Sequence, residues 1–433
     1  MKAAYHTLGC KVNQYDTEAM RELFEQAGYE TVPFDGPADL YVINTCTVTG
    51  VGDKKSLQLI RRCRREHPSA EIIVAGCLAQ RSPEQVRLPG VRLILGTQRR
   101  GEVVQLFEEA VRTGTQCVAV DSLKKTPFES LAIRSLSEHV RAYMKIQEGC
   151  NRYCSYCIIP IVRGPIRSRP IAEIRAEAGR LAEAGYREIV LTGIHLTSYG
   201  QDLKDGGRLA DAIRAVHEVP GIRRIRLGSL EPVVVTPDFV HELERLPKVC
   251  RQFHLALQSG SDAILARMRR RYTASEFLEA CRLLRTAFPD CALTTDVMTG
   301  FPGETQENFE ETKRVCAAAG FARMHVFPYS EREGTAAAVM DGAVPRALRE
   351  QRARELIALG RQLEKQALQA FTGKRVEILT EKAEDGISTG YTGAYMRAAV
   401  RGEYPEGCLV CAVVKAVQKD TLICDTDEEE EEQ

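Results

Sequence analysis

Short apolar runs alternate with amphipathic segments in the first part of the chain. Five runs have the length and composition of strands, at residues 3–8, 40–44, 72–75, 93–95 and 118–120. Between the first two, apolar residues from Met20 to Ala27 recur at helical spacing, and Gly28 is suited to end that helix. Because strand–helix–strand alternation favours a parallel sheet with helices on its faces, we expect an α/β domain over residues 1–120.

The same alternation returns in the middle of the chain. It follows residues 121–140, which have no periodicity and are expected to link two domains. The expected strands are residues 143–147, 188–191, 224–227, 254–257, 293–297 and 325–327. Six β/α units are too few for a closed eightfold barrel, so we expect a partial (β/α)6 barrel over residues 141–370. Functional residues of such barrels lie at the carboxyl ends of the strands.

The last part of the chain has a different pattern. Short apolar runs at residues 376–379, 396–400, 409–414 and 422–424 are separated by glycines, which predicts a small all-β barrel over residues 371–433. The acidic run 427–433 is typical of a disordered, solubilising tail. Cys408 and Cys411 suggest a metal motif, but residues three apart in a strand point to opposite faces, so we do not favour one.

Composition limits the class of protein. At 433 residues the chain is too long for one ordinary core, and its 59 Lys and Arg balance its 59 Asp and Glu. Affinity for nucleic acid would therefore come from local patches. Fifteen Cys without an apolar leader indicate a reducing, cytoplasmic setting, and no run reaches the roughly eighteen apolar residues that a membrane span needs.

Three cysteines, Cys150, Cys154 and Cys157, fall within eight residues after one expected barrel strand. A structural zinc site would need a fourth protein ligand nearby, and none is evident. Three thiolates for a centre that takes four ligands favour an iron–sulfur cluster with one open position.

Three more cysteines, Cys10, Cys46 and Cys77, each follow the carboxyl end of an expected strand in the first domain. These ends share one edge of a parallel sheet, where ligands bind. Spacing alone leaves two readings equally open, a second metal site and buried free thiols that act as small hydrophobes.

The Cys150–Cys157 segment, with an aromatic residue before the last Cys, resembles the signature of radical S-adenosylmethionine enzymes. The segments Thr-Leu-Gly-Cys10-Lys-Val-Asn-Gln, Asn-Thr-Cys46-Thr-Val and Ala-Gly-Cys77-Leu-Ala-Gln resemble the methylthiotransferase branch of that family. The resemblance implies two 4Fe–4S clusters. One, held by Cys150, Cys154 and Cys157, binds and cleaves S-adenosylmethionine, and the auxiliary one, held by Cys10, Cys46 and Cys77, carries the sulfur.

The resemblance also implies contacts to S-adenosylmethionine. Tyr156 would lie near the adenine, and the loop at Thr192 and Gly193 would bind the methionyl amino group. Glu231 and Gln258 would contact the ribose or carboxylate, and the loop at residues 300–303, including Gly303, would approach through its backbone. His195 lies at the expected barrel mouth, where we expect a hydrogen-bonding role more than that of a base.

The function implied is radical insertion of sulfur and methyl at C2 of an adenosine in tRNA, using two molecules of S-adenosylmethionine. The Cys10 segment more resembles members that act on N6-threonylcarbamoyladenosine beside the anticodon. Alternatives are isopentenyladenosine, an aspartate of a ribosomal protein, and a non-catalytic iron–sulfur RNA-binding protein.

The expected partners are the anticodon stem-loop of tRNA, a low-potential electron donor such as flavodoxin or ferredoxin, and no membrane. The last domain resembles the RNA-binding TRAM module. Two basic stretches, residues 61–65 and 269–272, are candidates for RNA contact, although a solvated helix face explains each nearly as well.

Overall fold

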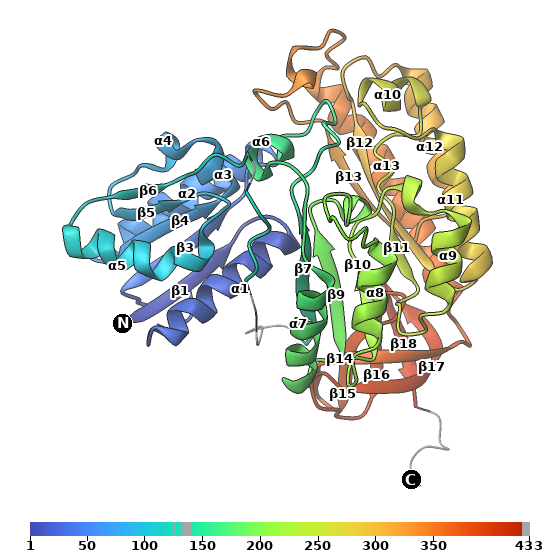
Figure 1. Cartoon of the computed structure of the whole chain (residues 1–433). Coiled ribbons are helices and arrows are strands. Elements are labelled where there is room, and N and C mark those ends of the chain that lie inside the picture. The colour runs from blue at the N-terminus through green and yellow to red at the C-terminus, as the bar shows by residue number, and fades with distance from the viewer. Residues whose placement is uncertain (125, 132, 134–139, 427–433) are drawn as a thin grey trace.

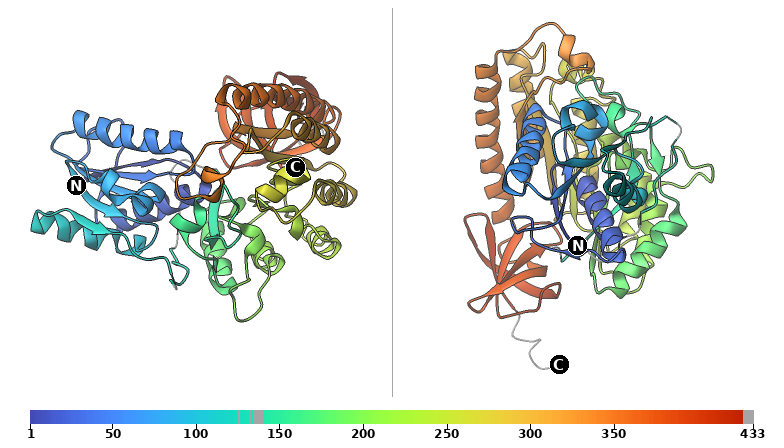
Figure 2. Two further views of the ribbon diagram at one scale, coloured as in Figure 1. Left: turned by 90° about the horizontal axis from the view of Figure 1, so that it is seen from above. Right: turned by 90° about the vertical axis from the view of Figure 1, so that its left-hand side faces the viewer.

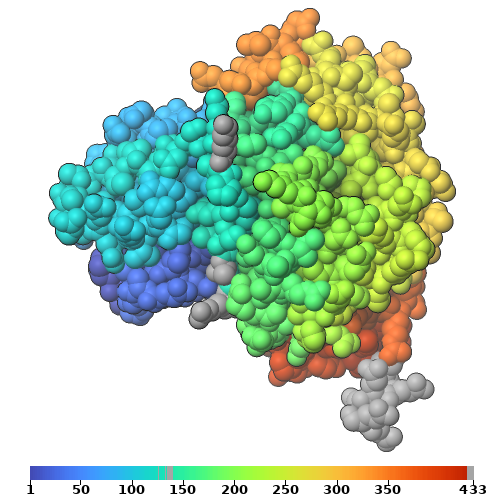
Figure 3. All heavy atoms as spheres, viewed as in Figure 1, coloured from blue at the N-terminus to red at the C-terminus, as the bar shows by residue number. Residues whose placement is uncertain are grey.

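The computed structural model describes residues 1–124, 126–131, 133 and 140–426, and divides into three parts (Figure 1). An amino-terminal α/β part lies beside a central barrel, and a small β-barrel sits under the central one. The space-filling view shows the blue-to-cyan amino-terminal part abutting the green start of the central part (Figure 3). The α/β fold class expected from the alternation of runs is confirmed.

The amino-terminal part is a parallel six-stranded sheet in the order β2-β1-β3-β4-β5-β6. Its strands are β1 Lys2–Thr7, β2 Glu30–Thr31, β3 Leu40–Thr45, β4 Glu71–Gly76, β5 Val91–Leu95 and β6 Cys117–Ala119. Its helices are α1 Lys11–Gln26, α2 Gly50–Glu66, α3 Cys77–Arg81, α4 Pro83–Val86, η1 Arg100–Glu102 and α5 Val103–Thr113.

Alternate residues along the strands of this sheet pack into two separate hydrophobic cores, one on each face. Tyr41 and Ile43 pack with Ile60 of α2 on one face, whereas Leu40 and Val42 pack with Phe24 of α1 on the other. Helix α1 follows β1 and α2 follows β3, so the chain leaves these neighbouring strands toward opposite faces. Such a switch point opens a crevice at the carboxyl ends of the two strands.

The central part is a partial barrel of six parallel strands. The strands are β7 Ala142–Glu148, β9 Glu188–Gly193, β10 Arg224–Leu227, β11 Gln252–His254, β12 Ala292–Thr299 and β13 Arg323–Pro328. The first three form one sheet with the short antiparallel strand β8 Arg167–Ser168, and the last three form another. Isolated bridges from Ile225 to Val249 and from Leu230 to Leu255 join the two sheets, so the barrel stays open between β7 and β13.

Amphipathic helices cover the outside of the barrel and bury its main core. The helices and short helical turns of this part are α6 Ile159–Arg163, α7 Ile171–Glu183, η2 Leu196–Ser198, α8 Leu209–His217, η3 Pro232–Val234, α9 Pro237–Glu244, α10 Asp262–Arg267, α11 Ala274–Ala287, α12 Gln306–Ala319, η4 Ala336–Val339 and α13 Arg346–Gln369, of which α6 and η4 lie outside the main core. Helices α11 and α12 begin with capping boxes, at Thr273 with Glu276 and at Thr305 with Asn308, which explains their sharp starts.

The carboxyl-terminal part is a closed five-stranded barrel in the order β14-β15-β16-β18-β17. Its strands are β14 Arg375–Glu384, β15 Ile387–Thr392, β16 Arg397–Arg401, β17 Leu409–Gln418 and β18 Thr421–Asp425. The all-β barrel is as expected, but the sequence reading missed β15. Its inward residues are Ser388, Gly390 and Thr392, so this strand lacks the apolar alternation that reveals the others.

The amino-terminal part spans the open side of the central barrel (Figure 2). On one side, α1 packs against β7. On the other, Arg332, which follows β13, donates to Thr47 Oγ1 and Asp53 Oδ2, both at 2.7 Å. The crevice of the α/β sheet is thereby attached to both edge strands of the barrel.

Several expectations fall outside the described residues or shift slightly. The connection at 121–140 includes residues 125, 132 and 134–139, and the acidic tail is residues 427–433, none of which the structure describes. Strand β11 is Gln252–His254 and not residues 254–257. Among the described residues, no helix combines the length and the apolar character that crossing a membrane requires.

Candidate functional site

Cys150, Cys154 and Cys157 lie in the loop that joins the carboxyl end of β7 to α6. Gly149 has a φ of +69°, and a Cβ there would lie 1.9 Å from the Pro165 carbonyl oxygen. Only glycine fits this close approach, so the turn that delivers Cys150 from the strand depends on it.

The rest of the loop is anchored to the barrel mouth through Ser155, which is fully buried. Its Oγ donates to the Arg267 carbonyl at 2.8 Å, its N–H donates to the Met268 carbonyl at 3.1 Å, and its own carbonyl accepts from Ala337 at 2.7 Å. These bonds hold the three thiols in place without any metal.

Beside this loop, the buried carboxylate of Glu231 is surrounded by polar side chains. Its oxygens lie 2.6 Å from Arg152 Nη2, 2.9 Å from Arg270 Nη2 and 3.2 Å from His195 Nε2. Burial alone would raise the pKa of Glu231, but the hydrogen bond from His195 and the charges of Arg270 and Arg152 lower it to about 2. Glu231 is therefore an ionised acceptor, suited to hydroxyl or ammonium donors of a ligand.

His195 has both ring nitrogens engaged, because Nδ1 lies 2.6 Å from Ser198 Oγ while Nε2 faces Glu231. Its backbone N–H donates to Gln147 Oε1 at 2.6 Å, and a Cβ on Gly193 would lie 2.9 Å from Gln147 Cβ. The loop at Thr192 and Gly193 is thus tied to the strand that leads into Cys150. This agrees with the hydrogen-bonding role expected for His195.

Other expected ligand contacts gather at the same mouth. The ring of Tyr156 lies 6.3 Å from that of Phe301, centroid to centroid, in the loop at residues 300–303. Gln258 has a φ of +64°, an uncommon conformation for a residue with a side chain and one often found at functional sites. The Gly303 N–H, however, donates to the Gly342 carbonyl at 2.7 Å, so it is not free to bind a ligand.

Cys10, Cys46 and Cys77 meet at the switch point of the amino-terminal sheet. Cys10 is the N-cap of α1, Cys46 follows β3, and Cys77 begins α3. A Cβ on Gly9 would lie 3.2 Å from Cys46 Sγ, which brings the first two segments together. The thiols of Cys10 and Cys46 both act electrostatically on Cys77, so the three form one group.

The second group lies against the first. Cys77 shares an apolar cluster with Ile158, which directly follows Cys157, and with Val162, four residues further on. Nε of Arg163, the last residue of α6, donates to Cys77 Sγ at 3.3 Å. Cys77 of the second group thus contacts the short segment, residues 158–163, that follows Cys157 of the first group.

Both groups have the chemistry of thiolate ligands. All 15 cysteines are free thiols. Sulfurs in each group accept hydrogen bonds: Cys150 from the Arg152 N–H at 3.4 Å, Cys154 from Arg270 Nη1 at 3.3 Å and Cys77 from Arg163. Such donors stabilise the negative charge of metal-bound sulfur.

Burial raises the pKa of Cys77 and Cys150 to about 11 and that of Cys157 to about 12, so metal must supply the charge that keeps them ionised. Among the described residues, no three His, Cys, Asp or Glu side chains converge closely enough to hold a single metal ion. A four-iron cluster spreads its ligands over a wider span than one ion does. Both sets of residues fit a cluster of that kind.

The structure gives two residues of one basic stretch a different environment from the one expected for RNA contact. In the stretch 269–272, Tyr272 is buried and its hydroxyl donates to the Ala256 and Leu257 carbonyls, while Arg270 points to Glu231 and Cys154. These two side chains are turned toward the thiol site and away from an RNA-binding surface. Arg269 and Arg271 are exposed, so RNA contact through them stays a prediction. In the stretch 61–65, Arg62 is exposed and pairs with Asp35 and Glu66.

Sequence reasoning missed the charged side chains that support the thiols, including Arg163 and Asp16. Arg163 lies six residues after Cys157, which was its one available signal. Asp16 likewise lies six residues after Cys10, but the partners of both side chains are far away in the chain.

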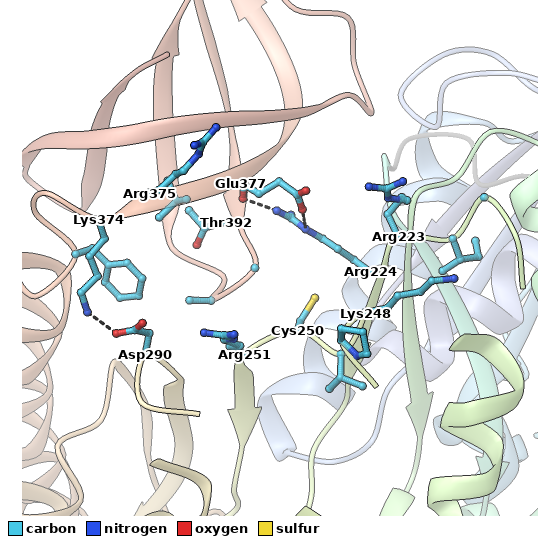
Figure 4. Close-up of a pocket in the computed structure, with 18 residues that line it drawn as sticks. Arg223, Arg224, Lys248, Cys250, Arg251, Asp290, Lys374, Arg375, Glu377 and Thr392 are labelled. Carbon is cyan, nitrogen blue, oxygen red and sulfur yellow. Dashed lines mark hydrogen bonds and ion pairs between the residues drawn. The ribbon is translucent and has the colours of Figure 1, made fainter. Parts of the chain in front are cut away.

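A separate cavity of about 680 Å³ lies at the other ends of the barrel strands, against the carboxyl-terminal barrel (Figure 4). Arg224 donates to Glu377 Oε1 at 2.7 Å and Lys374 to Asp290 Oδ1 at 2.5 Å across it. Its lining comes from segments before β10 and β11, whereas the thiols follow the carboxyl end of β7. This cavity is part of the contact between the two barrels and not the site of the thiols.

Comparison with known proteins identifies related chains. Residues 144–316 match the Radical SAM superfamily model, and residues 2–96 match that of Uncharacterized protein family UPF0004. The threonylcarbamoyladenosine tRNA methylthiotransferase MtaB of Bacillus subtilis is 43% identical over 92% of this chain and 90% of its own length. The protein of that name in Thermotoga maritima is 36% identical over 90% and 89%.

A second kind of relative has a different name. The tRNA-2-methylthio-N(6)-dimethylallyladenosine synthase of Frankia casuarinae is 38% identical over 89% of this chain and 72% of its own length. Among solved structures, a radical S-adenosylmethionine methyltransferase, TsrM, from Kitasatospora setae superposes with a TM-score of 0.56 at 15% identity, covering 78% of this chain and 77% of that one. This last likeness concerns the fold alone.

Proposed function

The chain belongs to the radical S-adenosylmethionine methylthiotransferase family, and on that premise we propose that it adds a methylthio group to C2 of N6-threonylcarbamoyladenosine beside the anticodon of tRNA. A 4Fe–4S cluster and S-adenosylmethionine go with the family. A second 4Fe–4S cluster is part of the proposal.

We assign the first cluster to Cys150, Cys154 and Cys157, and the second to Cys10, Cys46 and Cys77. When bound, the clusters and S-adenosylmethionine supply a carbon-centred radical, which takes hydrogen from an unactivated carbon, and the sulfur to be inserted. Glu231, Gln258 and the loop at Thr192 and Gly193 would orient S-adenosylmethionine. Tyr156 and Phe301 offer aromatic surface to its adenine.

One observation carries the proposal: Cys77 of the second group of thiols contacts Ile158, Val162 and Arg163, in the segment that begins at Cys157 of the first group. Each group leaves one position of a four-iron cluster open. A radical generated at the first site would therefore arise next to the sulfur held at the second, as sulfur insertion requires.

Lys11 supports the choice of N6-threonylcarbamoyladenosine as substrate. This nucleoside carries a carboxylate, and the isopentenyl nucleoside does not. The Lys11 ammonium has no carboxylate within ion-pair distance among the described residues and lies 5.7 Å from the centre of the Tyr143 ring. Lys11 directly follows Cys10, and on adenine C2 and C6, the carbon that bears N6, flank the same nitrogen, N1. Burial and the charges of Arg226 and Arg141 lower the pKa of Lys11 to about 8, so a carboxylate ligand would stabilise its charged form.

The second candidate substrate is isopentenyladenosine, because a relative 38% identical has the name of a dimethylallyladenosine synthase. Nucleoside analysis of tRNA from a strain lacking the protein decides between the two. We expect loss of the methylthio derivative of N6-threonylcarbamoyladenosine alone. Loss of the isopentenyl derivative would reverse the assignment.

The remaining partners follow from the chemistry. Reduction of the first cluster requires a low-potential donor such as flavodoxin or ferredoxin, and the proposed location is the cytoplasm, where tRNA is modified. An anaerobic assay of the reduced protein with S-adenosylmethionine tests for radical chemistry. Formation of 5′-deoxyadenosine is expected, and its absence would favour a non-catalytic RNA-binding protein.

A further inference from the structure

Arg163 connects the central barrel to the second group of thiols. Its side chain is fully buried at the junction of the two parts. Nε donates to Cys77 Sγ at 3.3 Å, Nη1 lies 3.0 Å from both Asp16 Oδ2 and Glu148 Oε1, and Nη2 donates to Asn13 Oδ1. The oxygens of Asp16, Glu148 and Asn13 therefore fix the orientation of the guanidinium group, with Nε directed toward the Cys77 sulfur.

The described charges around Arg163 include more cations than carboxylates. Asp16 also pairs with Arg100 at 2.9 Å and Lys145 at 2.5 Å, and Arg100 pairs with the partly exposed Glu129 at 3.0 Å. A fourth buried cation, Arg167, donates to the Arg163 carbonyl and Thr126. In the part of the chain that the structure describes, the set is Arg100, Lys145, Arg163 and Arg167 with Asp16, Glu129 and Glu148.

Among the described residues, four cations face three carboxylates, so this group carries an excess of positive charge. Arg100 and Arg167 each keep a buried Nε without a hydrogen-bond partner. Buried charge without a partner is costly, so an anion near the group is favourable. Arg163 Nε is the donor that faces a sulfur, that of Cys77. Arg163 thus offers a hydrogen bond and a positive charge to the sulfur that we assign as a ligand of the second cluster.

We propose that Arg163 is a positioning residue for the second cluster, holding the Cys77 thiolate by a charge-assisted hydrogen bond and favouring the reduced, more negative state of the cluster. This rests on the proposed function for the existence of that cluster. Hydrogen bonds and positive charge at ligand sulfurs raise the reduction potential of iron–sulfur clusters. Removing Arg163 therefore shifts the midpoint potential to a more negative value.

The test measures one cluster at a time. The full-length C150A/C154A/C157A variant keeps only the second group of thiols and is reconstituted anaerobically. Redox titration followed by electron paramagnetic resonance gives the midpoint potential of its cluster. Adding R163Q is expected to shift that potential to a more negative value, and adding R163K to shift it less, because lysine keeps the charge but not the guanidinium geometry.

Arg270 supplies a matched control, since it is also buried and also donates to a sulfur at 3.3 Å, but to Cys154 of the first group. R270Q in the same background is expected to leave the potential unchanged. Equal shifts from R270Q and R163Q would overturn the inference. An unchanged potential in R163Q at full iron content would do the same.

Two further outcomes are decisive. If R163Q does not retain iron, R163K is the deciding variant, and an unchanged potential there contradicts the proposal. Loss of iron with unfolding in both variants, followed by circular dichroism, would assign Arg163 a purely structural role. Absence of any cluster in the background protein with Arg163 intact would instead overturn the proposed function, and this inference with it.

Discussion

At the residue scale, the proposed function depends on ligand sets that are each one short. Three thiolates would hold a four-iron cluster and leave one iron able to bind something else, whether S-adenosylmethionine or sulfur. We propose one such set at the cysteines that follow β7 and another at the cysteines of the switch point between β1 and β3. Single substitutions can distinguish the role of one set of cysteines from that of the other.

Replacing Cys150 by alanine should abolish formation of 5′-deoxyadenosine, because the first cluster is lost. Replacing Cys77 by alanine should leave 5′-deoxyadenosine formation on S-adenosylmethionine in place, remove the methylthio product and about halve the bound iron. Chromatography of products with iron analysis tests both variants. Cys316, which is buried in the main core, gives the control: C316A should keep both activities. Equal loss of 5′-deoxyadenosine in C77A and C150A would contradict the assignment.

Replacing Lys11 by methionine should raise KM for tRNA bearing N6-threonylcarbamoyladenosine about tenfold, corresponding to about 1.4 kcal/mol for one lost ion pair. Arginine at this position should restore much of the loss. Kinetics on tRNAs with and without the threonylcarbamoyl group provide the measurement. An equal rise in KM for both tRNAs would show that Lys11 does not recognise the carboxylate.

The six cysteines could be predicted from the sequence because their positions after strands follow from local patterns. The side chains that support them could not. Arg163 and Asp16 are 147 positions apart, and Arg270 and Cys154 are 116 apart. Their contacts exist only after the parts of the chain have packed together, and no local periodicity records that.

At the element scale, α1 and the β7–α6 connection are joined by buried ion pairs. Burial alone would raise the pKa of Glu148, but the charges of Arg163 and Lys145 outweigh it and lower it to about 2. The unfolded value is near 4.5. The ionised carboxylate therefore contributes stability above pH 4.5, and this contribution is lost as the pH falls toward 2.

Thermal unfolding followed by circular dichroism should accordingly show stability decreasing between about pH 4.5 and 2. E148Q should be less stable than the parent at pH 7 and should show a shallower decrease with acid. The exposed Glu66 is a suitable control, and E66Q should follow the parent curve. If E148Q and the parent lose stability in parallel over this range, Glu148 does not have the role assigned here.

Strand β15 marks the limit of periodicity as a guide to elements. Gly390 would place a Cβ 2.0 Å from the Leu379 carbonyl oxygen, so the crowded barrel interior requires glycine where an apolar residue would have revealed a strand. The barrel class could still be expected, because closure needs several short strands separated by turns. The number of strands in the barrel could not be predicted from the sequence.

At the scale of the whole molecule, the two barrels are held together by buried arginines. Arg226 of β10 is 1% exposed, lies 2.8 Å from Glu188, and donates to the Thr392 and Gly393 carbonyls of the carboxyl-terminal barrel. Its guanidinium carbon lies 4.5 Å from the centre of the Tyr395 ring. The charge balance of the whole chain could not have revealed this contact, because its cations and acids cancel overall.

Replacing Arg226 by methionine should lower the free energy of unfolding by about 3 kcal/mol, since it leaves buried carbonyls and part of Glu188 without a donor. Urea denaturation measures the effect. R282M, at an exposed arginine paired with Glu279, should give no measurable change. A loss in R226M no larger than in R282M would mean that Arg226 does not stabilise the junction.

The central claim is that two open clusters, side by side, insert sulfur into tRNA. The most direct measurement uses the reduced, reconstituted protein with S-adenosylmethionine and tRNA bearing N6-threonylcarbamoyladenosine, and analyses the nucleosides by mass spectrometry. The account predicts the 2-methylthio derivative in the native protein and none in variants lacking any one of the six cysteines. Methylthio product from C10A, C46A or C77A, or 5′-deoxyadenosine without methylthio product from the native protein, would contradict it.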